Sequence, residues 1–376
     1  MSRYEGNEDY AHGAREKLGV LVTNLGTPDA PETGALRRYL KEFLWDPRVV
    51  EAPRPLWWLI LHGIILRIRP SRSAAAYRAV WTEQGSPLLQ IAQAQTDGIR
   101  ARLETRLGGQ VEVALGMRYG NPSIPAALRQ LQERNCRRLL VLPLYPQYSA
   151  STTASTFDAL AATLMRWRWI PELRFITRYH DEHGYIGALA ASVREHWAAH
   201  GRGEHLVMSF HGVPRRYLDQ GDPYHCQCLK TGRLLAERLE LAEGSWSVTF
   251  QSRFGREEWL KPYTDASIRA LGARGLKRID VICPGFSADC LETIEEIGVE
   301  NAGYFKEAGG ETLSYIPCLN TRNDHLDYLA ELAARHLQGW PEAGAAPDPA
   351  RLAAESQAAR TRAERLIAAR EAGELG

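Results

Sequence analysis

Three sequence patterns occur twice in this chain, in the same order. Residues 19–28 (GVLVTNLGTP) resemble residues 205–214 (HLVMSFHGVP), because each runs from apolar residues through a small polar residue to Gly-X-Pro. Two further pairs of apolar runs match in their closing motifs, at residues 111–120 and 246–255 and at residues 137–149 and 276–289. An ordered repeat of this kind indicates two copies of one structural unit.

The repeated runs alternate with helical patterns, such as those at residues 124–132 and 263–271. Apolar, β-branched strands that alternate with helices form parallel sheets covered on both faces, so we predict two doubly wound α/β domains. A closing helix should follow, with Asn323 as its cap and Gly339 as its stop. The expected units are an N-terminal domain at 18–175 with an apolar lip segment at 55–72, a C-terminal domain at 176–320, the closing helix at 321–340 and a flexible or loosely helical tail at 341–376.

Composition argues against several classes of protein. A formal net charge of +1 on 376 residues does not suit a nucleic-acid binder, which needs an excess of Lys and Arg. The six cysteines are scattered, as in a cytoplasmic protein with reduced thiols, and we expect the N-terminus to be neither a secretory signal nor an anchor. No GxxxxGK motif is present, so nucleotide binding has no positive support.

The apolar run at residues 56–66 (LWWLILHGIIL) is shorter than the roughly 20 residues that a membrane-spanning helix needs. Its Trp57 and Trp58, followed by several arginines, suit an element at a membrane surface or the rim of an apolar pocket. A buried helix explains the run equally well.

Polar side chains follow the repeated runs, where parallel strands present their carboxyl ends and where ligands bind in such sheets. His211, Asp289 and Glu292 supply bases at these ends, and aromatic residues supply flat apolar surface, namely Tyr119, Tyr145, Tyr148, Trp259 and Phe286. A histidine at a strand end is more often structural. The first copy of its turn, however, has Leu25 in the same place, so the turn itself does not require an imidazole.

Two other patterns have competing interpretations. Glu292, Glu296 and Glu300 would form one row on a helix, which is either a solvated face or a path for a cation. The HCQC of residues 225–228 resembles a metal cluster, but it has no matching second pair and more readily opens a helix.

Several segments are similar, in order, to those of the ferrochelatase family. The two most specific are residues 206–224 (LVMSFHGVPRRYLDQGDPY) and residues 283–297 (CPGFSADCLETIEEI). The segments TNLGTPDAP, MRYGNP, LPLYPQYSASTT and FQSRFGREEWLKPYTD also match. The similarity covers about residues 18–338, which is nearly everything except the two ends.

This resemblance implies insertion of Fe(II) into a porphyrin, in the cleft between two Rossmann-like domains with four-stranded parallel sheets. It makes His211 and Glu292 the facing pair that binds iron and accepts the pyrrole protons, with Glu296 and Glu300 on an acidic route for iron. The implied porphyrin contacts are Leu25, Arg69, Tyr77, Ser86, Arg118, Tyr119, Tyr145, Trp259, Phe286 and Asp289. A neutral imidazole suits Fe(II), and its unperturbed pKa of about 6.5 lets it take a proton near neutral pH.

Departures from the family pattern refine these expectations. Cys290 stands where many members have His, which makes that neighbour of Glu292 dispensable as an iron ligand. Ala150 stands where cluster-bearing animal members place a Cys, and no Cys follows Cys318, so neither an iron–sulfur cluster nor another permanently bound cofactor is expected. Leu25 and the apolar run favour protoporphyrin IX as the substrate, which would make protoheme, the last step of heme biosynthesis.

Two alternatives remain open from the sequence. The chain could act on coproporphyrin III or insert another metal, or it could be a carrier that binds heme or another tetrapyrrole without chemistry. In the favoured interpretation its partners are a porphyrin and ferrous iron, with no nucleic acid. The protein is then cytoplasmic, with peripheral contact to the inner membrane face through residues 56–66.

Overall fold

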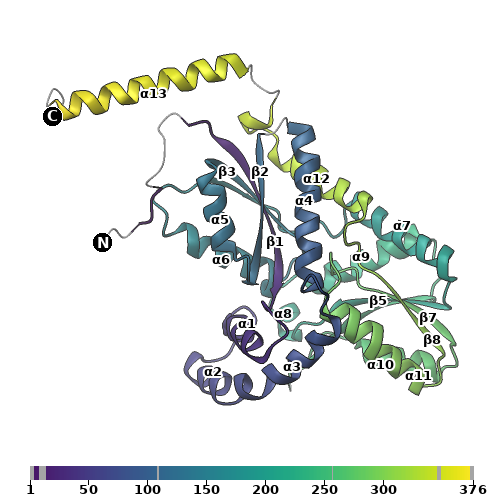
Figure 1. The fold of residues 1–376 in the computed structure, drawn as a ribbon. Coiled ribbons are helices and arrows are strands. Elements are labelled where there is room, and N and C mark those ends of the chain that lie inside the picture. Colours follow the sequence, from purple (N-terminus) through teal and green to yellow (C-terminus); the bar gives the residue numbers. More distant parts are fainter. Residues whose placement is uncertain (1–3, 8–13, 108–109, 256, 345–348, 373–376) are drawn as a thin grey trace.

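The computed structural model describes residues 4–7, 14–107, 110–255, 257–344 and 349–372, which form two four-stranded parallel sheets (Figure 1). The first sheet has the strand order β2-β1-β3-β4 and the second has the order β6-β5-β7-β8. The strands are β1 (Lys17–Thr27), β2 (Val111–Gly120), β3 (Cys136–Pro143), β4 (Glu172–Phe175), β5 (His205–His211), β6 (Trp246–Gln251), β7 (Arg278–Ile282) and β8 (Thr312–Ile316). The equal order in both sheets confirms the predicted α/β fold with two similar units.

Successive side chains of a strand point to opposite faces of its sheet, and the central strands here bury both faces against helices. In β1, Val20 packs into one apolar core and the next residue, Leu21, packs into another. In β5, Met208 packs into the same core as Val20, and the preceding residue, Val207, packs into a third core on the other face. Val20 and Met208 belong to the same core, so the two sheets share one apolar layer between them.

Helices cover the sheets on both sides (Figure 1). Those that precede β5 are α1 (Thr33–Trp45), α2 (Arg54–Ile60), the π-helical η1 (Leu61–Ile65), α3 (Leu66–Val80), α4 (Pro87–Leu107), α5 (Ile124–Glu133), the π-helical η2 (Ala150–Ala154), α6 (Ser155–Leu164) and α7 (His183–His200). Those that follow β5 are α8 (Arg215–Asp219), α9 (Tyr224–Arg238), α10 (Thr264–Ala273), the π-helical η3 (Glu292–Asn301), α11 (Ala302–Glu307), α12 (Asn323–Leu337), the 3₁₀ turn η4 (Pro341–Ala343) and α13 (Pro349–Glu371).

The closing helix α12 forms as predicted, but its cap differs. Asn323 is the first helical residue and Arg322 holds the cap position without a capping side-chain bond, so the predicted cap was wrong. The Asn323 side-chain oxygen instead accepts a hydrogen bond from Arg102, 3.0 Å away on α4. Gly339 follows the helix with a φ of 84°, the left-handed conformation that glycine adopts at a helix stop.

The tail and the lip segment are both helical. Most of the described tail forms the regular helix α13. This helix extends away from the rest of the molecule (Figure 1). In the lip segment, Trp57 packs inward and its indole N–H donates to the carbonyl of Leu44 at 2.7 Å, whereas Trp58 is 50% exposed. Among the helices that the structure describes, none is both long and apolar enough to cross a membrane.

Candidate active site

Two adjoining cavities lie at the carboxyl ends of β1 and β5, and Leu25, Thr152 and His211 line both. Most of the exposed wall of both cavities is apolar, as in sites for small-molecule or cofactor ligands. Among the expected site residues, those that line the first cavity are Leu25, Tyr77, Ser86, Tyr145, His211, Phe286 and Glu292. Leu25, His211 and Trp259 line the second. The structure therefore brings most of the expected residues together.

The imidazole of His211 is fixed by its own turn. Its Nδ1 lies 2.7 Å from the carbonyl oxygen of Gly212. A carbonyl can only accept, so Nδ1 carries the hydrogen and the neutral ring keeps its free lone pair on Nε2. The backbone is held as well, because the Tyr224 hydroxyl donates to the carbonyl of His211 at 3.0 Å. His211 can thus serve as a metal ligand or proton acceptor without rearranging.

Glu292 is the first residue of η3 and lines the first cavity beside Cys290. Burial, together with the nearby Glu292 charge, raises the pKa of the Cys290 thiol well above its usual value. Burial likewise raises the pKa of Tyr77, and the charge of Glu292 adds to it. The tyrosine and the thiol therefore stay protonated, and Glu292 is the acidic residue of this wall that can bind a cation.

The described residues around the cavity do not form a multi-ligand metal site. Within the ranges that the structure describes, no group of three or more His, Cys, Asp or Glu side chains is arranged to hold a metal ion. His211 and Glu292 instead stand as a pair on the wall of one cavity, from β5 and η3 respectively. Such a pair leaves coordination positions open for other ligands, which suits a transient cation better than a structural one.

The three glutamates expected in one row have separate surroundings. The segment is π-helical, so its backbone bonds run from i to i+5. Glu296 is turned to Ser252, whose backbone N–H and hydroxyl donate at 2.8 and 2.5 Å. Glu300 is exposed and accepts from the Tyr304 hydroxyl. Glu296 and Glu300 are therefore held by different neighbours, and their place on a route for iron stays a prediction.

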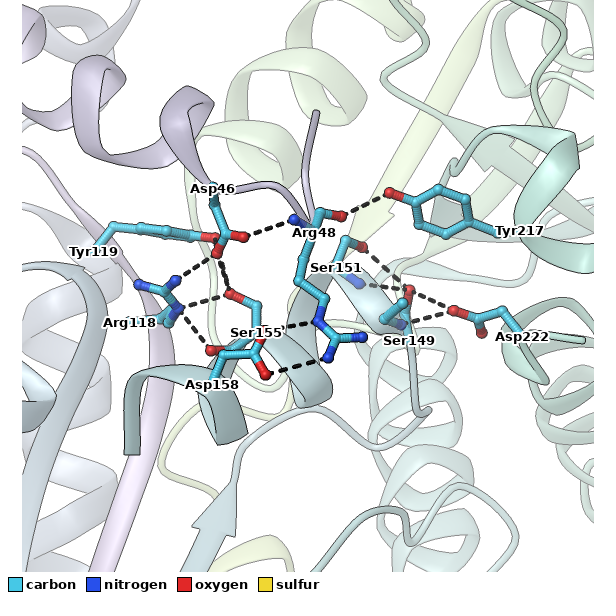
Figure 2. A network of polar contacts seen from close by, with 11 residues as sticks. Asp46, Arg48, Arg118, Tyr119, Ser149, Ser151, Ser155, Asp158, Tyr217 and Asp222 are labelled. Atoms are coloured by element: carbon cyan, nitrogen blue, oxygen red, sulfur yellow. Dashed lines mark hydrogen bonds and ion pairs between the residues drawn. The ribbon is translucent and has the colours of Figure 1, made fainter. Parts of the chain in front are cut away.

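Arg118 and Tyr119 are not among the described residues that line these two cavities, and Arg118 lines a third cavity together with Asp46. Figure 2 shows both side chains directed at Asp46, which is paired with Arg118 and accepts from the Tyr119 hydroxyl at 2.8 Å. The Ser155 hydroxyl donates to the same carboxylate at 2.5 Å. Tyr119 is fully buried, and its ring meets that of Phe43, which lines the second cavity, edge to face at 5.0 Å.

Two other expected contacts also lie outside the cavity walls. Asp289 accepts hydrogen bonds from the Tyr315 hydroxyl at 2.5 Å and the Asn320 amide at 2.6 Å, so its carboxylate is engaged in holding the chain beyond β8. Arg69 is exposed on α3, with its guanidinium 5.9 Å from the ring of Phe254. Because Phe254 lines the second cavity, Arg69 lies near its edge.

Sequence reasoning did not identify Asp46 or Gln251. Asp46 follows helix α1 in a WDPR segment, and its side-chain partners Arg118, Tyr119 and Ser155 are 72 to 109 residues away, so no local pattern marks it. Gln251 did carry a signal, because the matching position of the first repeat is Gly116. A polar side chain present in one repeat only is the same kind of difference that singled out His211.

Comparisons with known proteins give a consistent family. The family model described as Ferrochelatase matches residues 17–337. A protein named Ferrochelatase from Thioalkalivibrio sulfidiphilus is 63% identical over 361 residues, covering 96% of this chain and 98% of the relative. Another of that name, from Marinobacter nauticus, is 62% identical over 337 residues and covers 90% and 91%.

One solved structure shows the same fold at low identity. It is described as SirB from Bacillus subtilis with Fe3+, and it matches with a TM-score of 0.51 and 12% identity. The match covers 86% of this chain and 96% of that one. At this identity the similarity concerns the arrangement of the two parallel sheets.

Proposed function

The chain belongs to the ferrochelatase family, and on that premise we propose that it inserts Fe(II) into protoporphyrin IX between His211 and Glu292. The protein is a metal chelatase with a porphyrin and iron as its substrates. Insertion replaces two pyrrole protons by one ferrous ion, so the site must accept protons, hold a cation briefly and enclose an apolar ring. The observation that carries the proposal is the single free lone pair, on Nε2 of His211, at the junction of the two cavities.

In this proposal His211 accepts the pyrrole protons and can ligate the incoming iron. Its bond to the Gly212 carbonyl sets the tautomer before substrate binds, so no ring flip or proton shift precedes the reaction. The same bond stabilises the ring after protonation, because Nδ1–H remains a donor in the imidazolium. Imidazole nitrogen is also a suitable ligand for Fe(II).

In this proposal Glu292, on the wall of the same cavity, supplies the carboxylate. A carboxylate attracts Fe(II) and stabilises the imidazolium that forms when His211 takes a proton. Cys290 stays a neutral thiol, which supports an oxygen and nitrogen site rather than a thiolate site. Since the substrate iron and the protein's own base account for the chemistry, we propose that no permanently bound cofactor is required.

The charge of the cavity walls supports protoporphyrin over coproporphyrin. Coproporphyrin carries four propionates and protoporphyrin only two, so the former needs more cationic partners. Of the described residues that line the first cavity, none is Lys or Arg, and the second adds Arg216, which is already paired with Glu257. Exposed Arg69, near the second cavity, can reach a propionate that emerges there.

A competition between the two porphyrins tests this choice. With anaerobic Fe(II) and equal porphyrin concentrations, we expect protoheme to form with a kcat/KM at least about tenfold above that for coproporphyrin, the equivalent of one unpaired charge. Faster turnover of coproporphyrin would overturn the substrate assignment. Repeating the assay with Co(II) and Zn(II) identifies a different metal preference, and recovery of unchanged porphyrin with every metal would identify a carrier.

We further propose a cytoplasmic location with peripheral membrane contact through the lip segment. All six cysteines are free, as expected in a reducing compartment. Leu56, Trp58 and Leu59 on α2 are 56%, 50% and 61% exposed, and an apolar patch of this kind suits a membrane interface. A sparingly soluble porphyrin could then enter the cavities from the lipid surface.

A further inference from the structure

Gln251 lies at the end of β6, beside His211 at the end of β5. The two residues are register partners in the parallel sheet. Gln251 is only 3% exposed and belongs to neither cavity wall among the described residues. It therefore does not touch a ligand in either cavity, but it is the buried neighbour of the residue that does.

The backbone of Gln251 holds the His211 turn. Its carbonyl accepts a hydrogen bond from the N–H of Gly212 at 2.8 Å. A Cβ at position 212 would lie 2.8 Å from that same carbonyl oxygen and 3.1 Å from the ring of Trp259. Because real Cβ atoms do not approach oxygen so closely, glycine is what allows the turn to lie against Gln251.

The side chain of Gln251 holds the start of η3. Its amide nitrogen donates to the carbonyl of Glu292 at 3.0 Å and lies 3.5 Å from a carboxylate oxygen of Glu296. Its amide oxygen accepts from the buried hydroxyl of Ser209 at 2.7 Å. Both neighbours of the nitrogen can only accept and the hydroxyl donates, so the orientation of the amide is determined.

We propose that Gln251 is a positioning residue that fixes His211 and Glu292 relative to each other. The backbone of Gln251 bonds the turn that carries His211, and its side chain bonds Glu292, the first residue of η3. Both residues of the proposed site are therefore held by the same buried residue. The inference rests on the proposed function, because the relative position of His211 and Glu292 matters only if the two residues act together on iron. Without the amide, the carbonyl of Glu292 and the hydroxyl of Ser209 would each lose a buried partner.

Gln251→Met and Gln251→Glu test this role. Methionine keeps the length and removes both polar groups, while glutamate keeps the acceptor for Ser209 and loses the donor to Glu292. We expect each to lower kcat on the order of 10- to 100-fold, as displacement of a reacting group does. The KM for porphyrin and the Kd for porphyrin without iron, measured by fluorescence, should stay within about twofold of the parent.

Val248→Ala is the matched control. Val248 is 8% exposed on the same strand and packs in the apolar core beside Gly232. Its side chain lies on the opposite face of the strand from that of Gln251, because side chains alternate along a strand. The substitution should lower the Tm while leaving kcat within about twofold, because a stability change alone does not alter the site. His211→Ala, assayed in parallel, should lack activity.

Three results would overturn the inference. Parental kcat in both Gln251 variants would remove the positioning role, as would an equal loss of kcat in Val248→Ala. Failure of both Gln251 variants to fold would assign the residue to the fold instead. If His211→Ala keeps full activity, the proposed pair itself fails and the inference with it, whereas an inactive His211→Ala beside active Gln251 variants rejects only the positioning role.

Discussion

Asp46 is a buried carboxylate whose partners come from three separate parts of the chain. Burial by itself would raise the pKa of Asp46, but donors from Ser155, the Arg48 backbone and Tyr119, together with the Arg118 charge, lower it from its usual value. These bonds join the end of α1 to β2 and α6 (Figure 2). The ionised form of Asp46 is therefore part of the folded structure.

Asp46→Asn should destabilise the protein by about 3–5 kcal/mol at neutral pH, because it leaves the Arg118 charge buried without its partner. The pKa of Asp46 is lower in the folded state. Its contribution is therefore full above the unfolded pKa of about 3.9, and is lost as the pH falls through the folded value. The difference between parent and variant in urea unfolding should accordingly narrow below about pH 4.

Asp158→Asn is the control for that measurement. Its pair with Arg48 has side chains 43% and 40% exposed, so solvent screens it and the loss should stay below about 1 kcal/mol. Equal losses in the two variants, or a deficit in Asp46→Asn that does not change with pH, would show that the buried pair is not the source of the stability.

Individual residues of the site differ in how well the sequence predicted them. His211 could be found because the repeat has Leu25 in its place, and Glu292 because it lies in a family segment. Arg118 and Tyr119 were expected to contact the porphyrin, and the structure shows both bonded to Asp46, so the contact itself stays a prediction. A side chain at a strand end can face either of two directions, and a partner about 72 residues away decides which.

At the scale of elements, the lip segment illustrates how one apolar run can serve two purposes. The run is helical through α2, η1 and α3, so its side chains divide between opposite faces. Trp57 packs against Leu44, Leu61 and Leu66, while the exposed face carries Leu56, Trp58, Leu59, Ile64 and Ile68. The two sequence interpretations, a buried helix and a surface element, thus describe opposite faces of the same segment.

The exposed face of α2 should determine membrane binding. The triple variant Leu56→Ser, Trp58→Ser and Leu59→Ser should lower the partition coefficient onto anionic vesicles at least about 10²-fold, since each large side chain contributes about 1.5–3 kcal/mol when buried. Met165→Ser with Ile170→Ser is the control, because these residues are 72% and 55% exposed elsewhere on the molecule. Cosedimentation that is unchanged in the triple variant would reject membrane contact through the lip.

Sequence periodicity did not identify the helix type of η3. The spacing of Glu292, Glu296 and Glu300 predicts one face of an α-helix, but the segment is π-helical, and Glu296 and Glu300 bond to Ser252 and Tyr304. A π-helix has no distinctive sequence pattern, because it differs from an α-helix only in which backbone groups pair. Its position at the cavity follows from tertiary contacts such as the one from Gln251.

At the scale of the whole molecule, the repeat predicted the topology well. Each matched pattern became the same strand in its sheet, so β1, β2 and β3 correspond to β5, β6 and β7. The repeat could not predict how the two sheets meet, because the shared apolar core joins residues far apart in sequence. That meeting places the carboxyl ends of β1 and β5 at the same two cavities.

Metallation at His211 is tested most directly by single-turnover kinetics. Protein saturated with protoporphyrin IX is mixed anaerobically with Fe(II), and the change in the porphyrin absorption band reports heme formation apart from binding and release. We predict that His211→Ala binds porphyrin as the parent does but forms heme at least about 10³-fold more slowly, as loss of a proton acceptor and ligand requires. His225→Ala is the matched control, since its ring stacks on Phe250 at 5.5 Å and should leave the rate unchanged. Heme formation in His211→Ala at the parental rate would contradict the assignment.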